Sequence, residues 1–331
     1  MEIKRWTAIL LCIILCAGSI PIPCNAAVKK TSGTDGNGNT WVYDEKTKTL
    51  TFSGNNKGID DYSFDGHSPE PDWYVWNTKA EHIIINDGVT GIGKWAFYAF
   101  VKLKTVEMAD SVTSIRDAAF IFCGNLTSVK LSANIKSIRG EAFYGCNKLE
   151  HLTLPDTLKT LGSFGACSKL KEVIMPDSVF KTNKNLFYDC RSLTKIKLPK
   201  GMKEIKPRDF ANCKNLRTLD IPEAVTTVSM SAFSGTKLKK ITLPKNVTTI
   251  KKGMPYRGKD KVFAVNNDSE LPTKNLRLIE IKSKKVKSIA KGSFSGLSSK
   301  VVIKVPKIRK KKYTKMLRKS GLEKKVKIKT L

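Results

Sequence analysis

Residue types that commonly carry out chemistry are sparse in this sequence. The chain of 331 residues has three histidines, which are His67, His82 and His151. No Ser/His/Asp or Cys/His set with the local context of a known catalytic motif surrounds them. Asp60, Asp61 and Asp65 suggest paired carboxylates or a calcium loop, but the twelve-residue ligand pattern of such a loop is absent. We interpret these acids as solvated loop residues and predict no catalytic residue, cofactor or metal site.

Cysteines are the second reactive group. Three of the eight, Cys12, Cys16 and Cys24, lie near the N-terminus, and the others share one phase of a repeat: Cys123, Cys146, Cys167, Cys190 and Cys213. Disulfides are conceivable in an exported chain, but five is an odd number, and stacked parallel side chains do not turn toward each other as a disulfide requires. The absence of a C-x-x-C pair argues against a metal site. We predict a buried column of reduced thiols.

Positive charge is concentrated in the last third of the chain. The formal net charge is +31, and residues 237–331 carry 30 Lys and Arg against five acids. Such a field favours polyanions, among them wall polymers, anionic lipid surfaces, glycosaminoglycans and nucleic acid. The alternative is that lysines keep the surface soluble and prevent exposed strand edges from pairing. The cluster at residues 309–312 is denser than solubility requires.

A repeated element of about 23 residues must position these side chains. Copies such as KIKLPKGMKEIKPRDFANCKNLR begin with apolar residues at alternate positions, which is typical of a β-strand. A proline often ends the strand, and a second apolar pair and an Ala-Phe step follow. The phenylalanines of that step are Phe97, Phe120, Phe143, Phe164, Phe187, Phe210, Phe233 and Phe294. One copy cannot bury its apolar face alone, so the copies are predicted to stack around a continuous aromatic column.

Three copies depart from this pattern. The copy that begins at Leu152 is two residues short before Phe164, and the next copy has Thr182 where an apolar residue is expected. Residues 251–274 have lost the Ala-Phe step. We interpret that segment as a degenerate coil with a strand at residues 262–265.

The repeats resemble the BspA-like leucine-rich-repeat family of bacterial surface proteins, over roughly residues 40–331. DGNGNTWVYDEKTKTLTFSG and PDWYVWNTKAEHIIINDGVTGIGKWAFY are similar to the N-terminal hairpin region of that family, and VVIKVPKIRKKKYTKMLRKSGLEKKVKI resembles its closing segment. The resemblance implies an α/β leucine-rich-repeat solenoid of stacked short parallel strands joined by short helical turns. It also implies a β-hairpin cap at the N-terminus and a helix-strand cap at the C-terminus. Members of the family are regarded as surface adhesins, which implies protein binding.

Both ends of the array contain clustered apolar residues. The segment WYVW at residues 73–76 could be a sugar-stacking platform, but clustered aromatics usually bury, so we interpret it as the plug of the N-terminal cap. Near the C-terminus, a helix ended by Gly321 is predicted to cover the last coil. Its apolar stripe comprises Ile308, Tyr313, Met316 and Leu317. Val326 and Ile328 predict a closing strand.

The N-terminus has the pattern of an export signal. Two basic residues precede an apolar run at residues 6–20, and small residues follow, so cleavage is predicted after Ala26 or Ala27. The run is too short for a comfortable transmembrane span, and no second apolar stretch follows. We predict a secreted or cell-surface protein without a transmembrane segment in the mature chain. The expected domains are a signal peptide at 1–26, an N-terminal β cap region at 27–81, the solenoid at 82–305, with its degenerate coil at 251–274, and a basic C-terminal cap at 306–331.

The exposed face of the first strand of each copy is the leading candidate site. A rigid ladder of side chains suits a large partner, because it loses little entropy on binding. The candidate residues are Glu107, Lys130, His151, Thr153, Lys195, Lys197, Asp220 and Lys240. We therefore predict a non-enzymatic, exported adhesin that binds an extracellular or host matrix protein, or another cell surface.

The alternative site is the basic C-terminal third. It predicts a module that binds an anionic wall polymer or a glycosaminoglycan, with nucleic acid a less favoured partner. The candidate residues are Arg309, Lys310, Lys311, Lys312, Lys315, Arg318 and Lys319. A secreted hydrolase is the least favoured reading, since the reactive residues form no recognisable set.

Overall fold

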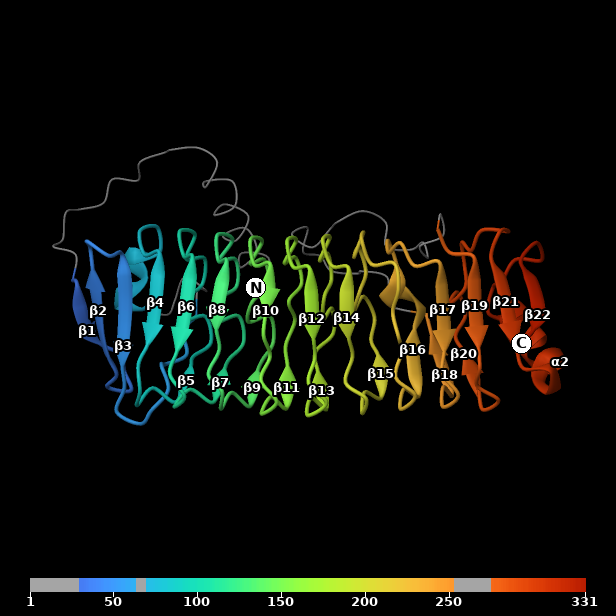
Figure 1. Cartoon of the computed structure of the whole chain (residues 1–331), viewed down its shortest axis with the longest axis horizontal. Coiled ribbons are helices and arrows are strands. Elements are labelled where there is room, and N and C mark those ends of the chain that lie inside the picture. Colours follow the sequence, from blue (N-terminus) through green and yellow to red (C-terminus); the bar gives the residue numbers. More distant parts are fainter. Residues whose placement is uncertain (1–29, 64–69, 253–274) are drawn as a thin grey trace.

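The apolar alternation of each repeat places one short strand per coil in a common row, which we term the first row. The computed structural model describes residues 30–63, 70–252 and 275–331, and the strands of this row lie side by side in it (Figure 1). The row consists of β4 (His82–Ile85), β6 (Thr105–Met108), β8 (Ser128–Lys130), β10 (His151–Leu152), β12 (Glu172–Ile174), β14 (Lys195–Lys197), β17 (Lys240–Leu243), β19 (Leu278–Ile281), β21 (Val302–Val305) and β22 (Lys327–Thr330). In β6, Val106 and Met108 are buried and Glu107 is exposed. The predicted leucine-rich-repeat solenoid of parallel strands is confirmed.

A second row of shorter strands lies along the lower edge of the array in Figure 1. It consists of β5 (Gly91–Ile92), β7 (Ser114–Ile115), β9 (Ser137–Ile138), β11 (Thr160–Leu161), β13 (Lys181–Thr182), β15 (Glu204–Ile205), β16 (Thr227–Ser229), β18 (Thr249–Lys251) and β20 (Ser288–Ile289). The second apolar pair of the repeat supplies its buried residues, such as Ile115 and Ile138. Parallel pairing between neighbours adds a second line of hydrogen bonds between coils.

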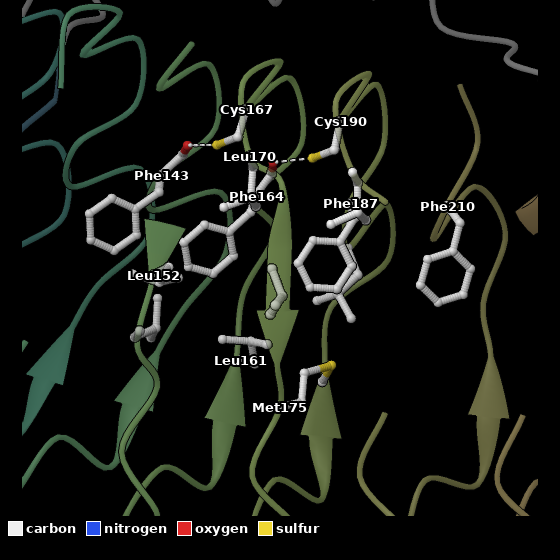
Figure 2. Close-up of a cluster of buried hydrophobic side chains, with 14 of the residues drawn as sticks. Phe143, Leu152, Leu161, Phe164, Cys167, Leu170, Met175, Phe187, Cys190 and Phe210 are labelled. Atoms are coloured by element: carbon white, nitrogen blue, oxygen red, sulfur yellow. Dashed lines mark hydrogen bonds between the residues drawn. The ribbon is translucent and has the colours of Figure 1, made fainter. Parts of the chain in front are cut away.

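The phenylalanines of the Ala-Phe step form the predicted column inside the coils from Phe97 to Phe233, whereas Phe294 is buried but stacks on no other described phenylalanine. From Phe97 to Phe233 all the rings are fully buried, and consecutive rings are stacked with interplanar angles of 7–19°. Figure 2 shows four of them in line. The centroid spacing is 5.1–5.4 Å from Phe97 to Phe164 and 6.3–6.4 Å from Phe164 to Phe233. The stacking of the coils therefore loosens halfway along the array.

The five described cysteines run beside this column. All are free and buried, and each Sγ donates to the carbonyl oxygen of the phenylalanine in the preceding coil at 3.1–3.4 Å. Figure 2 shows Cys167 with Phe143 and Cys190 with Phe164. Burial raises the pKa of Cys123 and Cys167 to about 12. The predicted column of reduced thiols is confirmed.

A tight turn follows each column phenylalanine. The second residue after it has a positive φ, between 53° and 76°, in eight coils: Ala99, Phe122, Gly145, Ala166, Asp189, Asn212, Gly235 and Gly296. Its backbone N–H can then reach the next coil, as Asp189 N–H reaches the carbonyl oxygen of Ala211 at 2.8 Å. Single turns of this kind connect most coils, and 3₁₀ helices occur at η1 (Asp72–Trp76) and η2 (Met230–Phe233).

The N-terminal end is an antiparallel ribbon. β1 (Ser32–Thr34), β2 (Thr40–Asp44) and β3 (Thr49–Ser53) pair in that order, and β3 pairs in parallel with β4. Trp41 from β2 and Trp73 and Trp76 from η1 are buried, and Trp76 stacks on Tyr43 with 4.1 Å between ring centroids. Burial of both η1 tryptophans agrees with a plug and not with a sugar-stacking platform.

The C-terminal end contains the helix α2 (Lys310–Lys319) after the 3₁₀ helix η4 (Lys307–Arg309). Tyr313 and Leu317 are buried and Met316 is half-buried. Gly321 has a φ of 94° just after the helix, as a C′ residue requires. β22 pairs in parallel with β21, as predicted for a closing strand. The inclusion of Ile308 in the apolar stripe was wrong: Ile308 lies in η4, outside the helical periodicity, and is 77% exposed.

The irregular copies keep their place in the array. The short coil still inserts Phe164 between Phe143 and Phe187. Thr182 is half-buried in β13, opposite Leu161. The predicted signal peptide at 1–26, the predicted strand at 262–265 and most of the degenerate coil lie outside the described residues.

Candidate binding surface

The first row carries the candidate face, and it is divided into three hydrogen-bonded sections. β4, β6 and β8 continue the N-terminal ribbon; β10, β12 and β14 form the middle section; β17, β19, β21 and β22 form the last. Residues 217–222 lie between β14 and β17 in the order of the coils and have the usual Leu-x-Ile-Pro pattern, but they form no strand. β17 is the first strand of the last section and pairs with β19 on one side. Its other edge, which faces residues 217–222, therefore has no partner among the described strands.

All eight residues predicted for this face are exposed: Glu107, Lys130, His151, Thr153, Lys195, Lys197, Asp220 and Lys240. The structure brings them together in groups and not in one ladder. Glu107 lies opposite Lys130 in the first section. His151, Thr153, Lys195 and Lys197 belong to the middle section, and Asp220 and Lys240 line a groove at the second break.

Ion pairs between neighbouring coils fix the positions of some side chains on this face. Glu172 pairs with Lys195 at 2.5 Å, and Glu280 pairs with Lys240 at 2.9 Å. The exposed Lys130 and Lys197 form no ion pair with a described residue. Glu172 and Lys195 lie in register, so opposite charges at the same phase of consecutive coils are the signal by which this pair can be found in the sequence. Glu280 lies opposite Thr242, so its pair with Lys240 is diagonal and has no such signal. Ile174, which is half exposed in β12, adds an apolar side chain to the middle section.

The groove at the second break has a volume of about 560 Å³. Its floor contains the half-buried Leu219 and Ile221 and the buried Pro244. Charged side chains surround this floor; they are Arg217, Lys239, Lys240, Lys282, Asp220 and Glu223. Sequence reasoning missed Arg217, Lys239 and Lys282, because each lies one residue before or after the alternating segment of its repeat.

The basic C-terminal residues lie on η4 and α2. Arg309, Lys310, Lys311, Lys312, Lys315 and Lys319 are exposed. Arg318 is used differently: its guanidinium donates to the carbonyl oxygens of Glu323 and Val326, the latter at 2.9 Å, and it anchors the chain after the helix. The buried Tyr313 hydroxyl donates to the Ser283 carbonyl oxygen at 3.1 Å and attaches α2 to the array. The remaining cations form a surface fixed to the last coils.

The other candidate residues have structural partners. His82 Nδ1 lies 2.8 Å from Thr105 Oγ1. Asp61 pairs with Arg116 at 2.6 Å and accepts from the Lys94 N–H. His67 and Asp65 lie outside the described residues. Within residues 30–63, 70–252 and 275–331, no group of three or more His, Cys, Asp or Glu side chains is arranged to hold a metal ion.

One buried carboxyl was not anticipated. Asp209 occupies the position that alanine fills in the coils of Phe97, Phe120 and Phe143, and it is fully buried. Its two oxygens accept from the N–H groups of Lys206 at 2.7 Å and Leu186 at 3.3 Å. Loss of solvent outweighs these bonds and raises the pKa of Asp209 to about 7.

The repeats, the two strand rows and the phenylalanine column define a leucine-rich-repeat solenoid. The family described as a BspA type leucine rich repeat region (6 copies) matches residues 72–164 and 162–257, and the chain belongs to this family. No curated protein matches the chain. Among the described residues, no helix has the length and apolar character needed to cross a membrane.

Two solved structures have a similar fold. A leucine-rich repeat protein from Eubacterium ventriosum is 24% identical, with a TM-score of 0.54 over 84% of this chain and 78% of that chain. A leucine-rich repeat protein from Bacteroides ovatus is 20% identical, with a TM-score of 0.51 over 88% of this chain and 75% of that chain. At these identities the likeness concerns the fold alone.

Proposed function

We propose that this chain is an exported, non-enzymatic binding protein, an adhesin that is secreted or held at the cell surface. Membership of a leucine-rich-repeat family supports a binding role, because stacked repeats present extended surfaces to large partners. The partner we propose is an extracellular or host matrix protein, or another cell surface. Export rests on the signal-peptide pattern, with cleavage after Ala26 or Ala27.

The observation that carries this proposal is the exposed face of the first row. Its outward side chains stand on strands that are hydrogen-bonded to their neighbours and packed on a continuous core. Such side chains lose little conformational entropy on binding. The middle section combines the apolar Ile174 with Lys195 and Lys197, so it offers both burial and charge to a partner.

Binding measurements on purified matrix proteins and on whole cells test the proposal. A variant with Lys130→Ala, Lys195→Ala and Lys197→Ala should bind the partner at least tenfold more weakly. The matched control is Lys310→Ala, Lys311→Ala and Lys312→Ala, which removes the same charge from α2 and should bind the purified matrix proteins as the unaltered chain does. Equal binding by the first variant and the unaltered chain would refute a role for this face.

The exposed cations of η4 and α2 favour a second function. We propose that this surface retains the protein on an anionic polymer, such as a wall polymer or a glycosaminoglycan. In this arrangement the first row recognises a partner and the basic end holds the chain in place. The division of the chain into a signal peptide at 1–26, an N-terminal cap region at 27–81, a solenoid at 82–305 and a basic cap at 306–331 is part of the same proposal.

A further inference from the structure

The groove between residues 217–222 and β17 differs from the rest of the first-row face in its backbone. In the other described coils of the row, each strand pairs with at least one neighbour. No backbone hydrogen bond within the described residues joins residues 217–221 to another segment, and β17 is paired only with β19. N–H and C=O groups along this break are therefore available to a ligand that can donate and accept, as the open edge of a sheet is.

The side chains of the groove add a charge preference. Four cations and two acids line it. Lys240 is paired with Glu280, and a Glu223 oxygen accepts from the Lys245 N–H at 3.1 Å. Arg217, Lys239 and Lys282 are exposed and form no ion pair with a described residue. The groove therefore presents free positive charge around an apolar floor, and it is complementary to a ligand with acidic and aliphatic groups in alternation.

We propose that this groove binds an acidic peptide segment of the partner protein in an extended conformation. In an extended peptide, successive side chains point to opposite faces, so acidic residues can meet the three free cations while aliphatic residues cover Leu219 and Ile221. The peptide backbone can pair with the open groups of residues 217–221 or β17. A sulfated glycan satisfies the charge, but none of the described residues that line the groove is an aromatic on which a sugar could stack. This inference rests on the proposed adhesin function and adds the kind of segment that the face recognises.

Fluorescence anisotropy with the purified chain and a fluorescein-labelled peptide of repeated Glu-Val tests the proposal. We expect saturable binding, and no binding of a repeated Lys-Val peptide. The variant Arg217→Glu, Lys239→Glu and Lys282→Glu should lose about tenfold or more in affinity. The control Lys102→Glu, Lys136→Glu and Lys159→Glu has the same change in charge, lies outside both the groove and the α2 surface, and should bind the peptide within about twofold of the unaltered chain. All six positions are exposed, so both variants should keep the thermal midpoint of the unaltered chain.

Two further probes separate a peptide site from general attraction of anions. A Glu-Val peptide N-methylated on alternate residues keeps its charge but loses half of its backbone donors, so it should bind more weakly. Equal binding of the methylated peptide would overturn the proposal. A loss of peptide affinity of the same size in the groove variant and the Lys102, Lys136 and Lys159 variant would also overturn it, because the binding would then follow net charge. The proposal would also be overturned if a heparin oligosaccharide bound the groove more tightly than the peptide and displaced it.

The two proposals can fail separately. If the groove variant binds the peptide normally while the Lys130, Lys195 and Lys197 variant loses the whole partner, the adhesin face stands and the groove is not a peptide site. If neither variant affects binding of any matrix protein or cell, but the peptide still requires Arg217, Lys239 and Lys282, the groove is a peptide site and the wider face is not the adhesin surface.

Discussion

At the scale of single residues, burial governs the titratable groups of the core. The five thiols are fully buried and donate to carbonyl oxygens, and burial raises their pKa. Asp209 follows the same rule with a larger consequence, because it accepts two backbone hydrogen bonds and is still driven toward its neutral form. An acid here, in place of the alanine of other coils, makes stability depend on pH.

The pH dependence of unfolding should show the buried Asp209. Its pKa is about 7 in the folded chain against an ordinary value of 3.8, so as pH rises the unfolded chain releases this proton first. Its contribution to stability is therefore greatest below about pH 4 and is lost as pH rises to about 7. Relative to Asp209→Asn, the unaltered chain should lose up to about 4 kcal/mol between these limits in urea unfolding. Asp156→Asn, at an exposed acid, is the control; a constant difference between the unaltered chain and Asp209→Asn would contradict the prediction.

The thiols should be chemically silent in the native state. In a chain that begins at residue 28, five cysteines remain, and all five should react with a thiol reagent after denaturation. The native chain should react slowly, because the thiols are buried and the pKa of Cys123 and Cys167 is about 12. Mass spectrometry after timed labelling measures both. Rapid native labelling would show that the column opens, and fewer than five reactive thiols after denaturation would show disulfides.

At the scale of elements, three lines of contact join each coil to the next: the first row, the second row and the turn after the column phenylalanine. They do not remain equally intact along the array. The phenylalanine spacing widens after Phe164, the second row is interrupted between β13 and β15, and the first row is interrupted on both sides of residues 217–222. The turn bonds persist through this region, as Asp189 N–H to the carbonyl oxygen of Ala211 and Asn212 N–H to that of Ser234 show. These backbone bonds thus join neighbouring coils where sheet pairing fails.

The column should account for much of the stability of the array. Phe143→Ala removes a fully buried ring that stacks on Phe120 and Phe164, and we expect a loss of about 3 to 5 kcal/mol in the free energy of unfolding. Phe180→Ala is the matched control, since Phe180 is 76% exposed and should change stability by less than about 0.5 kcal/mol. Equal thermal midpoints for the two variants would refute the stacked-aromatic core.

At the scale of the whole molecule, charge is divided between the ends. Thirty of the 60 Lys and Arg residues lie in residues 237–331 with five acids, while the N-terminal ribbon and η1 contain acids such as Asp35, Asp44 and Asp72. Because the solenoid is elongated, the basic end acts at a distance from the middle section of the first row (Figure 1). Recognition and retention can therefore be separated by mutation.

Salt dependence should reveal the retention surface. Binding to heparin or purified cell wall should weaken steeply with salt, because each neutralised anion releases a counterion. Replacing Arg309, Lys310, Lys311 and Lys312 by Gln should flatten the slope of log affinity against log salt by up to about four contacts. The control is Lys102→Gln, Lys104→Gln, Lys130→Gln and Lys136→Gln, which removes the same charge from the N-terminal coils. Unchanged heparin and wall binding by the 309–312 variant at low salt would eliminate the retention role.

The sequence by itself determined those features that depend on residue type at a fixed phase of the repeat. Burial of a phenylalanine or cysteine needs only an apolar side chain at the inward position of each coil, and this position recurs in every regular copy of the repeat. The same holds for the strand alternation in β6 and for Gly321 after α2, where a residue with positive φ ends the helix. The exposure of Lys130, Lys195 and Lys197 follows from the same alternation. Ile308 was misplaced because the pattern does not say where a 3₁₀ turn gives way to a helix.

Only the tertiary structure decided how neighbouring coils pair. Residues 217–222 have the same Leu-x-Ile-Pro pattern as the paired strands, yet they remain unpaired and border the groove of Arg217, Lys239 and Lys282. Pairing depends on the distance and register between two coils, and these are set by the sum of all packing contacts along the array, including the wider spacing of Phe187, Phe210 and Phe233. The distance and register between two coils therefore cannot be inferred from the residues of a single copy. The exposed face of the first row could therefore be predicted from the repeat. The groove beside residues 217–222 could be found only in the assembled fold.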